Sequence, residues 1–210
     1  MNWPFDDATR RNIASACAAF ARLPAGDPVP ALKRAAVAIA LVDAADGAGG
    51  TAMLLTRRAA GLRSHRSQWA LPGGRCDAGE TQGTAALREL HEELGLELGP
   101  SDVLGLLDDY PTRSGYLITP VVVWAATGAA LQPNPDEVAS VHRIALDDIS
   151  QADAFDFVTI RESARRVIRF RHAGQFIHAP TAALIYQFRE VLAGRATRVD
   201  ELEQPVFAWK

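Results

Sequence analysis

The chain has 210 residues, of which 48% are hydrophobic, and a formal net charge of −3 at pH 7. This length supports one substantial core, and the small, mixed charge gives no global field that would attract nucleic acid or an anionic membrane. The longest apolar runs fall well short of the roughly 20 residues that a membrane-spanning helix needs. The N-terminus has the wrong polarity for a signal peptide, and the two cysteines form no metal-binding or redox pair. We therefore expect a soluble protein of the cytoplasm.

The first predicted elements are a helix and a hairpin. Residues 8–23 have the pattern of an amphipathic helix, and the proline-rich residues 24–30 end it. Two apolar, partly β-branched runs at residues 34–42 and 51–58 flank a glycine-rich turn, which predicts a β-hairpin.

Later segments complete an α/β pattern. The remaining apolar runs predict strands at residues 103–110, 116–126 and 138–146, and helices at residues 159–172 and 180–192. Together the elements predict a mixed β-sheet with helices on its faces. We expect three regions: an N-terminal helix and connector at 1–30, a main domain at 31–193 and a tail at 194–210.

Between the hairpin and the later strands, residues 73–96 gather glutamates on a short predicted helix. Glu89, Glu92 and Glu93 share one face of it, while its leucines point toward the core. Two like charges about 6 Å apart repel by about 0.7 kcal/mol even in water, so carboxylates kept together need a cation. Carboxylate oxygens suit Mg²⁺, which also binds waters and substrate phosphates. A solvated helix face is the alternative interpretation of such a helix taken alone.

The spacing of this segment resembles the Nudix box, G-x5-E-x7-R-E-U-x-E-E-x-G-U, in which U is aliphatic. Every fixed position is matched, from Gly74 through Glu80 and Arg88 to Leu96. The resemblance implies a Nudix hydrolase, which cleaves a nucleoside diphosphate linked to another group by attack of water on phosphorus, with Mg²⁺ or Mn²⁺. It also implies an α/β/α sandwich with a mixed sheet, an N-terminal helix and C-terminal helices, and makes residues 31–193 the Nudix domain.

The resemblance implies roles for individual residues. A bound metal neutralises the diphosphate, orients the leaving oxygen and lowers the pKa of a bound water. Glu80 and Arg88 would support the ligands. The implied ligands are Glu89, Glu92, Glu93 and the carbonyl group of Gly73.

A carboxylate must also take the proton of the attacking water. The family places this base variably, in the box or in a later loop. Glu92 and Glu137, the latter in the "NPDEV" segment, are therefore both candidates. An ordinary loop acid is the alternative interpretation of Glu137.

The segment directly before the box bears on the substrate. Residues 54–74, "LLTRRAAGLRSHRSQWALPGG", resemble the motif found upstream of the box in coenzyme A pyrophosphatases, from which Ser67, Trp69 and Leu71 depart. Its arginines present a planar guanidinium group that recognises phosphate, and coenzyme A carries a 3'-phosphate besides its diphosphate. The predicted substrate-binding residues are Arg58, Arg63, Arg66 and Gly74.

We therefore expect hydrolysis of coenzyme A or its derivatives to 3',5'-ADP and 4'-phosphopantetheine. Another nucleotide substrate, such as ADP-ribose or an oxidised nucleoside triphosphate, is the alternative, and a Nudix module that only binds its ligand is a third. The basic residues 161–172 predict a solvated or partner-facing helix surface rather than a site for nucleic acid or a membrane. The resemblance implies a small-molecule nucleotide as the partner and allows a homodimer.

Overall fold

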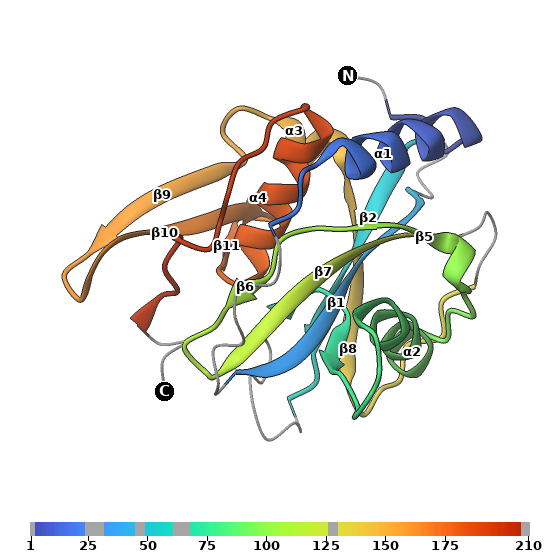
Figure 1. The fold of residues 1–210 in the computed structure, drawn as a ribbon, viewed down its shortest axis with the longest axis horizontal. Coiled ribbons are helices and arrows are strands. Elements are labelled where there is room, and N and C mark those ends of the chain that lie inside the picture. The colour runs from blue at the N-terminus through green and yellow to red at the C-terminus, as the bar shows by residue number, and fades with distance from the viewer. Residues whose placement is uncertain (1–2, 24–31, 45–48, 61–67, 126–129, 207–210) are drawn as a thin grey trace.

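A mixed β-sheet with helices on both faces forms the body of the protein, as predicted (Figure 1). The computed structural model describes residues 3–23, 32–44, 49–60, 68–125 and 130–206. Its helices are α1 (Asp7–Ala19), α2 (Gln82–Leu94), α3 (Leu146–Ser150) and α4 (Thr181–Leu192), with a 3-10 helix, η1, at Pro100–Asp102. Its strands are β1 (Lys33–Asp43), β2 (Thr51–Arg58), β3 (Trp69–Ala70), β4 (Gly73–Arg75), β5 (Val103–Leu106), β6 (Tyr110–Pro111), β7 (Tyr116–Trp124), β8 (Val138–Ala145), β9 (Phe155–Ile160), β10 (Ser163–His172) and β11 (Gln175–His178).

Strand β1 organises the main sheet, whose strand order is β3-β2-β1-β7-β5. It pairs with β2 in the predicted antiparallel hairpin and with β7 in parallel. The short strand β4 pairs with β1 as well, so that Gly73 lies opposite Val37 and Gly74 opposite Ala36. This pairing holds the double glycine at the start of the box against β1.

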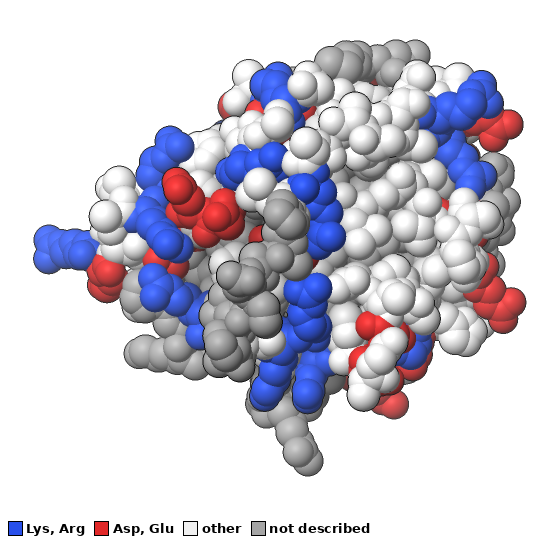
Figure 2. Space-filling view, viewed as in Figure 1, with Lys and Arg blue, Asp and Glu red and all other residues white. Residues whose placement is uncertain are grey.

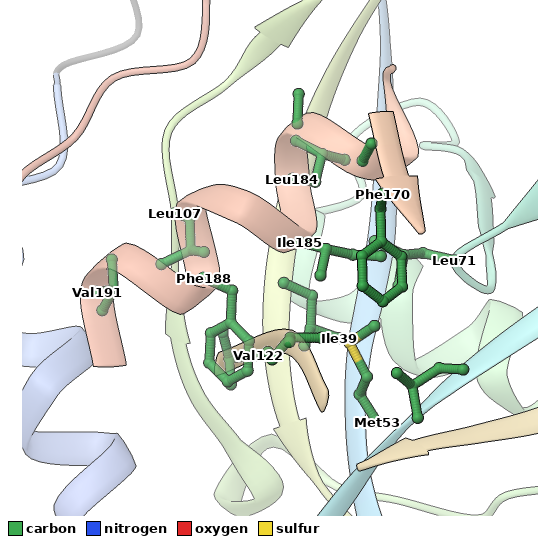
Figure 3. Packing of buried hydrophobic residues seen from close by; sticks show 14 of the residues in the cluster. Ile39, Met53, Leu71, Leu107, Val122, Phe170, Leu184, Ile185, Phe188 and Val191 are labelled. Atoms are coloured by element: carbon green, nitrogen blue, oxygen red, sulfur yellow. The ribbon is translucent and has the colours of Figure 1, made fainter. Parts of the chain in front are cut away.

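The two faces of the sheet bury different side chains. Toward α2, β1 presents Ala36, Ala38 and Ala40, whose small size lets the helix approach closely. Toward α1 and α4, larger side chains fill the core, as Figure 3 shows for Ile39 of β1 beside Phe188 of α4. Fully burying a side chain of this size contributes roughly 1.5–3 kcal/mol. None of the described helices is long and apolar enough to cross a membrane.

The helix predicted for residues 159–172 is wrong. These residues belong to β9 and β10, which form a three-stranded sheet with β11. Ile168 and Phe170 are buried in the core beside α4, while Arg169 lies between them in sequence and pairs with Asp156 of β9. Buried Ile168 and Phe170 alternate with the more exposed Arg169 and Arg171, which is the period of a strand.

The strand predicted for residues 103–110 is interrupted. It divides into β5 and β6 because Asp108 leaves the sheet and is buried in contacts with the C-terminal part of the chain. Its carboxylate accepts hydrogen bonds from Gln187 of α4 and from Arg198 at 3.1 and 2.6 Å. The hydrogen bonds that this buried carboxylate accepts from the two donors stabilise the fold more than two further backbone hydrogen bonds within the sheet would.

Helix α2 ends at Gly95, which adopts a left-handed conformation with φ of +68°. A Cβ atom on Gly95 would lie 2.8 Å from the Cβ of Gln132. The amide of Gln132 donates a hydrogen bond of 2.8 Å to the carbonyl of Leu94. The glycine therefore lets the loop before β8 sit directly on the end of α2.

Replacing Gly95 with alanine is expected to lower the free energy of unfolding by about 1–2 kcal/mol, because a side chain at this φ is strained and meets Gln132. Gly99 is the matched control, since it has a negative φ and a Cβ atom added to it would meet no described atom within 4 Å. Urea denaturation of both variants measures the difference. A loss for Gly99→Ala equal to that for Gly95→Ala would contradict the explanation.

Glu203 fastens the C-terminal segment to the body. Its side chain is almost fully buried and accepts hydrogen bonds from Arg113, at 2.5 and 3.1 Å, and from Ser163 of β10 at 2.8 Å. The Arg113 guanidinium is the main reason that the pKa of Glu203 falls from 4.5 to about 2. Stability from this carboxylate is therefore present above pH 4.5 and is lost as the pH falls toward 2.

The variant Glu203→Gln is expected to be less stable than the wild type by on the order of 2 kcal/mol at pH 7, because a neutral amide no longer offers a charge to the Arg113 guanidinium. The gap should shrink between about pH 4.5 and about pH 2, where the wild-type carboxylate takes up a proton. Urea denaturation across this range checks the result. A gap that does not change with pH would show that the charge of Glu203 is not the stabilising feature.

Candidate active site

The box carboxylates project from α2 because the helix is fixed at both ends and along one side. Thr81 caps its N-terminus, accepting a hydrogen bond of 3.2 Å from the amide of Thr84. Leu90 and Leu94 are fully buried against the sheet. Glu89 and Glu93 are therefore turned toward β4, where Gly74 lies against the carboxylate of Glu89 and the amide of Gly73 acts on Glu93.

Arg88 holds the box together. Its guanidinium donates to both carboxylate oxygens of Glu80, at 3.0 and 3.1 Å, and to Glu89 and Glu92, at 2.9 Å each. A further bond of 3.0 Å reaches the carbonyl of Arg75 in β4. The guanidinium is the main reason that the pKa of Glu80 is lowered. One arginine thus connects the approach loop, the helix and the strand.

Glu93 is the most deeply buried of the box carboxylates, with 3% of its side chain exposed. Arg58, at the end of β2, places a guanidinium nitrogen 3.7 Å from one carboxylate oxygen of Glu93, and the other oxygen has no hydrogen-bond partner. Burial raises the pKa of Glu93 to about 8, while the charge of Arg58 and the amide of Gly73 act in the opposite direction. One oxygen of this buried carboxylate therefore lacks a hydrogen-bond donor among the described residues.

Glu137 joins the same group from the loop before β8. The loop is tied to α2, since the amide of Asn134 donates 2.9 Å to the carbonyl of Glu93, and to β2, since the amide of Ala59 donates 2.8 Å to the carbonyl of Glu137. The negative charge of Glu137 raises the pKa of both Glu89 and Glu93, although burial is the main cause for each. Three carboxylates from two segments therefore act on one another.

The two glycines of β4 leave space for this group. Gly73 has φ of +153°, and a Cβ there would lie 2.3 Å from the carbonyl oxygen of Ala36. A Cβ on Gly74 would lie 2.3 Å from a carboxylate oxygen of Glu89. A larger residue at Gly73 would displace the strand, so glycine is required there by contact as well as by conformation, whereas a larger residue at Gly74 would displace the carboxylate of Glu89.

The donor set fits a divalent cation, although the side chains must move to form the site. Within the described residues no three acidic, histidine or cysteine side chains are close enough together to hold an ion as they stand. Instead, arginines contact Glu89 and Glu93. The buried, unpartnered oxygen of Glu93 and the oxygen-only chemistry of the three carboxylates match the preference of Mg²⁺ and Mn²⁺.

The predicted site residues separate into groups. Glu93 lies beside Arg58 and Gly73, Glu89 lies beside Gly74, and the charge of Glu137 acts on both carboxylates. Glu92 points further outward: 49% of its side chain is exposed. Arg63 and Arg66 lie outside the described residues.

Two contacts were missed from the sequence. The ion pair between Arg58 and Glu93 joins segments far apart in the chain. The period-two pattern of β2 would have placed Arg58 on the face of Leu54 and Thr56, toward α2. The bond from Asn134 to the end of α2 is made by backbone atoms, which carry no sequence signal.

Positive side chains also gather beside the segment that connects β4 to α2. A hollow of about 330 Å³ there is lined by Lys33, Arg34 and Arg75, together with Glu80. Figure 2 shows lysine and arginine side chains as a blue band down the middle of one face, next to a broad uncharged area. Attraction for an anion is therefore local, in agreement with the small net charge.

Comparisons with known proteins identify the family of this chain. The NUDIX domain model matches residues 32–166. A protein of Photorhabdus laumondii subsp. laumondii described as uncharacterized Nudix hydrolase NudL is 35% identical over 141 residues, which are 66% of this chain and 75% of the relative. A protein of the same description from Pectobacterium atrosepticum is 35% identical over 146 residues, covering 68% of this chain and 76% of the relative.

A solved structure supports the fold. The crystal structure of RenU, a Nudix hydrolase from M. Smegmatis, is 24% identical, with a TM-score of 0.51, and the match covers 77% of this chain and 86% of that chain. The family model spans the sheet, the box helix and the loop that carries Glu137. With the box complete and its carboxylates gathered at one site, the chain belongs to the Nudix family of hydrolases.

Proposed function

We propose that this Nudix hydrolase cleaves the diphosphate of coenzyme A or its derivatives, releasing 3',5'-ADP and 4'-phosphopantetheine. The observation that carries the hydrolytic part is the group formed by Glu89, Glu93 and Glu137 beside the double glycine. The coenzyme A part is supported by the motif at residues 54–74, whose Arg58 reaches this group.

Glu89 and Glu93 would hold the metal, Mg²⁺ or Mn²⁺, with Glu92 as a further ligand from the exposed side of α2. Bound there, the ion would neutralise the diphosphate and lower the pKa of a water molecule. Arg88 keeps Glu89 and Glu92 in register by bonding both with one nitrogen. The carbonyl of Gly73 is the remaining proposed ligand, since its strand runs beside Glu93.

Glu137 is the better placed of the two proposed bases. Its carboxylate is near enough to Glu89 and Glu93 to raise the pKa of each, whereas Glu92 is bonded to Arg88 and is half exposed. A base must be within hydrogen-bond reach of the water that attacks phosphorus. The loop bonds that tie Asn134 to α2 hold Glu137 close to where that water would be bound.

A second nucleotide substrate, such as ADP-ribose or an oxidised nucleoside triphosphate, is favoured by one departure from the upstream motif. Trp69 packs edge-on against His142 and His172, at ring-centroid distances of 4.6 and 5.5 Å, and Arg57 lies over its ring. Trp69, at the centre of this aromatic cluster, stands where the coenzyme A motif has a smaller residue.

A substrate panel tests the proposed specificity. Incubation with Mg²⁺ and coenzyme A should yield 3',5'-ADP and 4'-phosphopantetheine, resolved by product chromatography. ADP-ribose and an oxidised nucleoside triphosphate serve as the comparison substrates, and each should be cleaved at a lower kcat/KM. Cleavage of ADP-ribose without turnover of coenzyme A would reject the coenzyme A assignment while keeping the hydrolase.

The variant Glu93→Gln tests the metal site. It removes the charge of a buried carboxylate with little change in shape, so kcat should fall on the order of 100-fold or more while the protein stays folded. Glu97→Gln, at an exposed position just beyond α2, is the matched control and should keep wild-type activity. Circular dichroism checks the folded state. A Glu93→Gln enzyme with the wild-type rate would contradict the assignment.

A homodimer in the cytoplasm stays a prediction. Light scattering of the purified protein would measure the mass in solution against the 22.6 kDa of one chain.

A further inference from the structure

Of the arginines that the structure describes, two contact the box carboxylates, and they do so in very different ways. Arg88 makes hydrogen bonds from all three of its guanidinium nitrogens, at 2.9 to 3.1 Å. Arg58 approaches Glu93 only at 3.7 Å, beyond hydrogen-bond distance, and its buried Nε atom has no partner among the described residues. The first arrangement is complete, whereas the second leaves polar atoms unsatisfied on both sides.

Arg58 and Glu93 form an ion pair in which the arginine is partly exposed and the glutamate is buried. Arg58 lies at the end of β2 with 26% of its side chain exposed, while only 3% of the Glu93 side chain is exposed. One oxygen of Glu93 has no hydrogen-bond partner in the described part of the chain. Such a pair offsets the charge of the carboxylate but leaves one of its oxygens without a hydrogen bond, so a cation that binds this oxygen can replace the ion pair at little cost.

We propose that Arg58 is the resident counterion of Glu93, which a divalent cation displaces, so that its guanidinium group turns toward the phosphate of the substrate. The inference rests on the proposed function, because it takes Glu93 to be a metal ligand. Arg88, by contrast, stays in place, since its bonds to Glu80 and to the carbonyl of Arg75 do not depend on the metal ligands. Arg58 is thus a positioning residue for Glu93 before it contacts substrate.

This exchange couples the two binding events. While Arg58 neutralises Glu93, an incoming cation must overcome both the ion pair and the repulsion of the guanidinium charge. Once displaced, the same charge is free to meet an anion. The enzyme would then offer its phosphate-binding arginine only when the metal is already bound.

The coupling predicts an increase in metal affinity when the charge of Arg58 is removed. In Arg58→Met, Mn²⁺ should bind at least about fivefold more tightly than in the wild type, because the competing cation is gone. Arg58→Lys keeps the charge and should stay within about twofold of the wild type. Arg57→Met is the matched control. Arg57 directly precedes Arg58 in β2, but it is paired with Trp69 of β3 and its guanidinium lies over the ring of Trp69. It should leave Mn²⁺ binding unchanged.

The free Mn²⁺ signal in electron paramagnetic resonance measures the dissociation constant directly and needs no turnover. The titrations are run under argon at pH about 9. Burial raises the pKa of the Glu93 carboxyl, so at a lower pH a proton would compete with the ion for this group. Thermal denaturation followed by circular dichroism confirms that each variant is folded. If Arg58→Met does not fold, Arg58→Gln takes its place with the same expectation.

Equal or weaker Mn²⁺ binding in the neutral Arg58 variant would overturn the inference, because Arg58 would then support Glu93 as a ligand or act independently of it. Failure of the proposed function gives a different result. In that case the wild type would bind Mn²⁺ no more tightly than Glu93→Gln, and both proposals would fall together.

Discussion

The repulsion among closely placed carboxylates is the constraint on which this structure depends. Glu89 and Glu93 lie in a largely buried place, where burial already disfavours their charged forms and the charge of Glu137 adds to this effect. Such a group persists only if positive charge balances it. In this chain Arg88 and Arg58 supply that charge from two different segments.

Several elements of the fold make room for these charged side chains. Small alanines on β1 let α2 pack closely against the sheet, and Gly74 of β4 leaves room for the carboxylate of Glu89. Gly95 brings the loop of Glu137 onto the end of the same helix. Each element therefore contributes either charge or the space in which charge can gather. Nothing in this arrangement requires a strong field from the rest of the surface, in agreement with a net charge of −3.

Much of this could be predicted because it depends on local spacing. The box helix follows from the spacing of its glutamates and leucines, and the β1–β2 hairpin follows from two apolar runs around a turn. The sheet of β9 and β10 could not be separated from a helix in the same way, because its arginines repeat at positions compatible with both periods. Only the burial of Ile168 and Phe170 against α4 decides between them. Contacts between distant segments, such as Arg58 with Glu93, depend on how strands assemble and have no local signal.

The most direct test of the central claim is a crystal structure determined with Mn²⁺ at a wavelength that gives its anomalous signal. The account predicts an anomalous peak bound by carboxylate oxygens of Glu89 and Glu93, with Arg88 still bonded to Glu80. Crystals grown with ample Mn²⁺ that show no peak there, and keep Glu89 on Arg88 and Glu93 on Arg58, would contradict it.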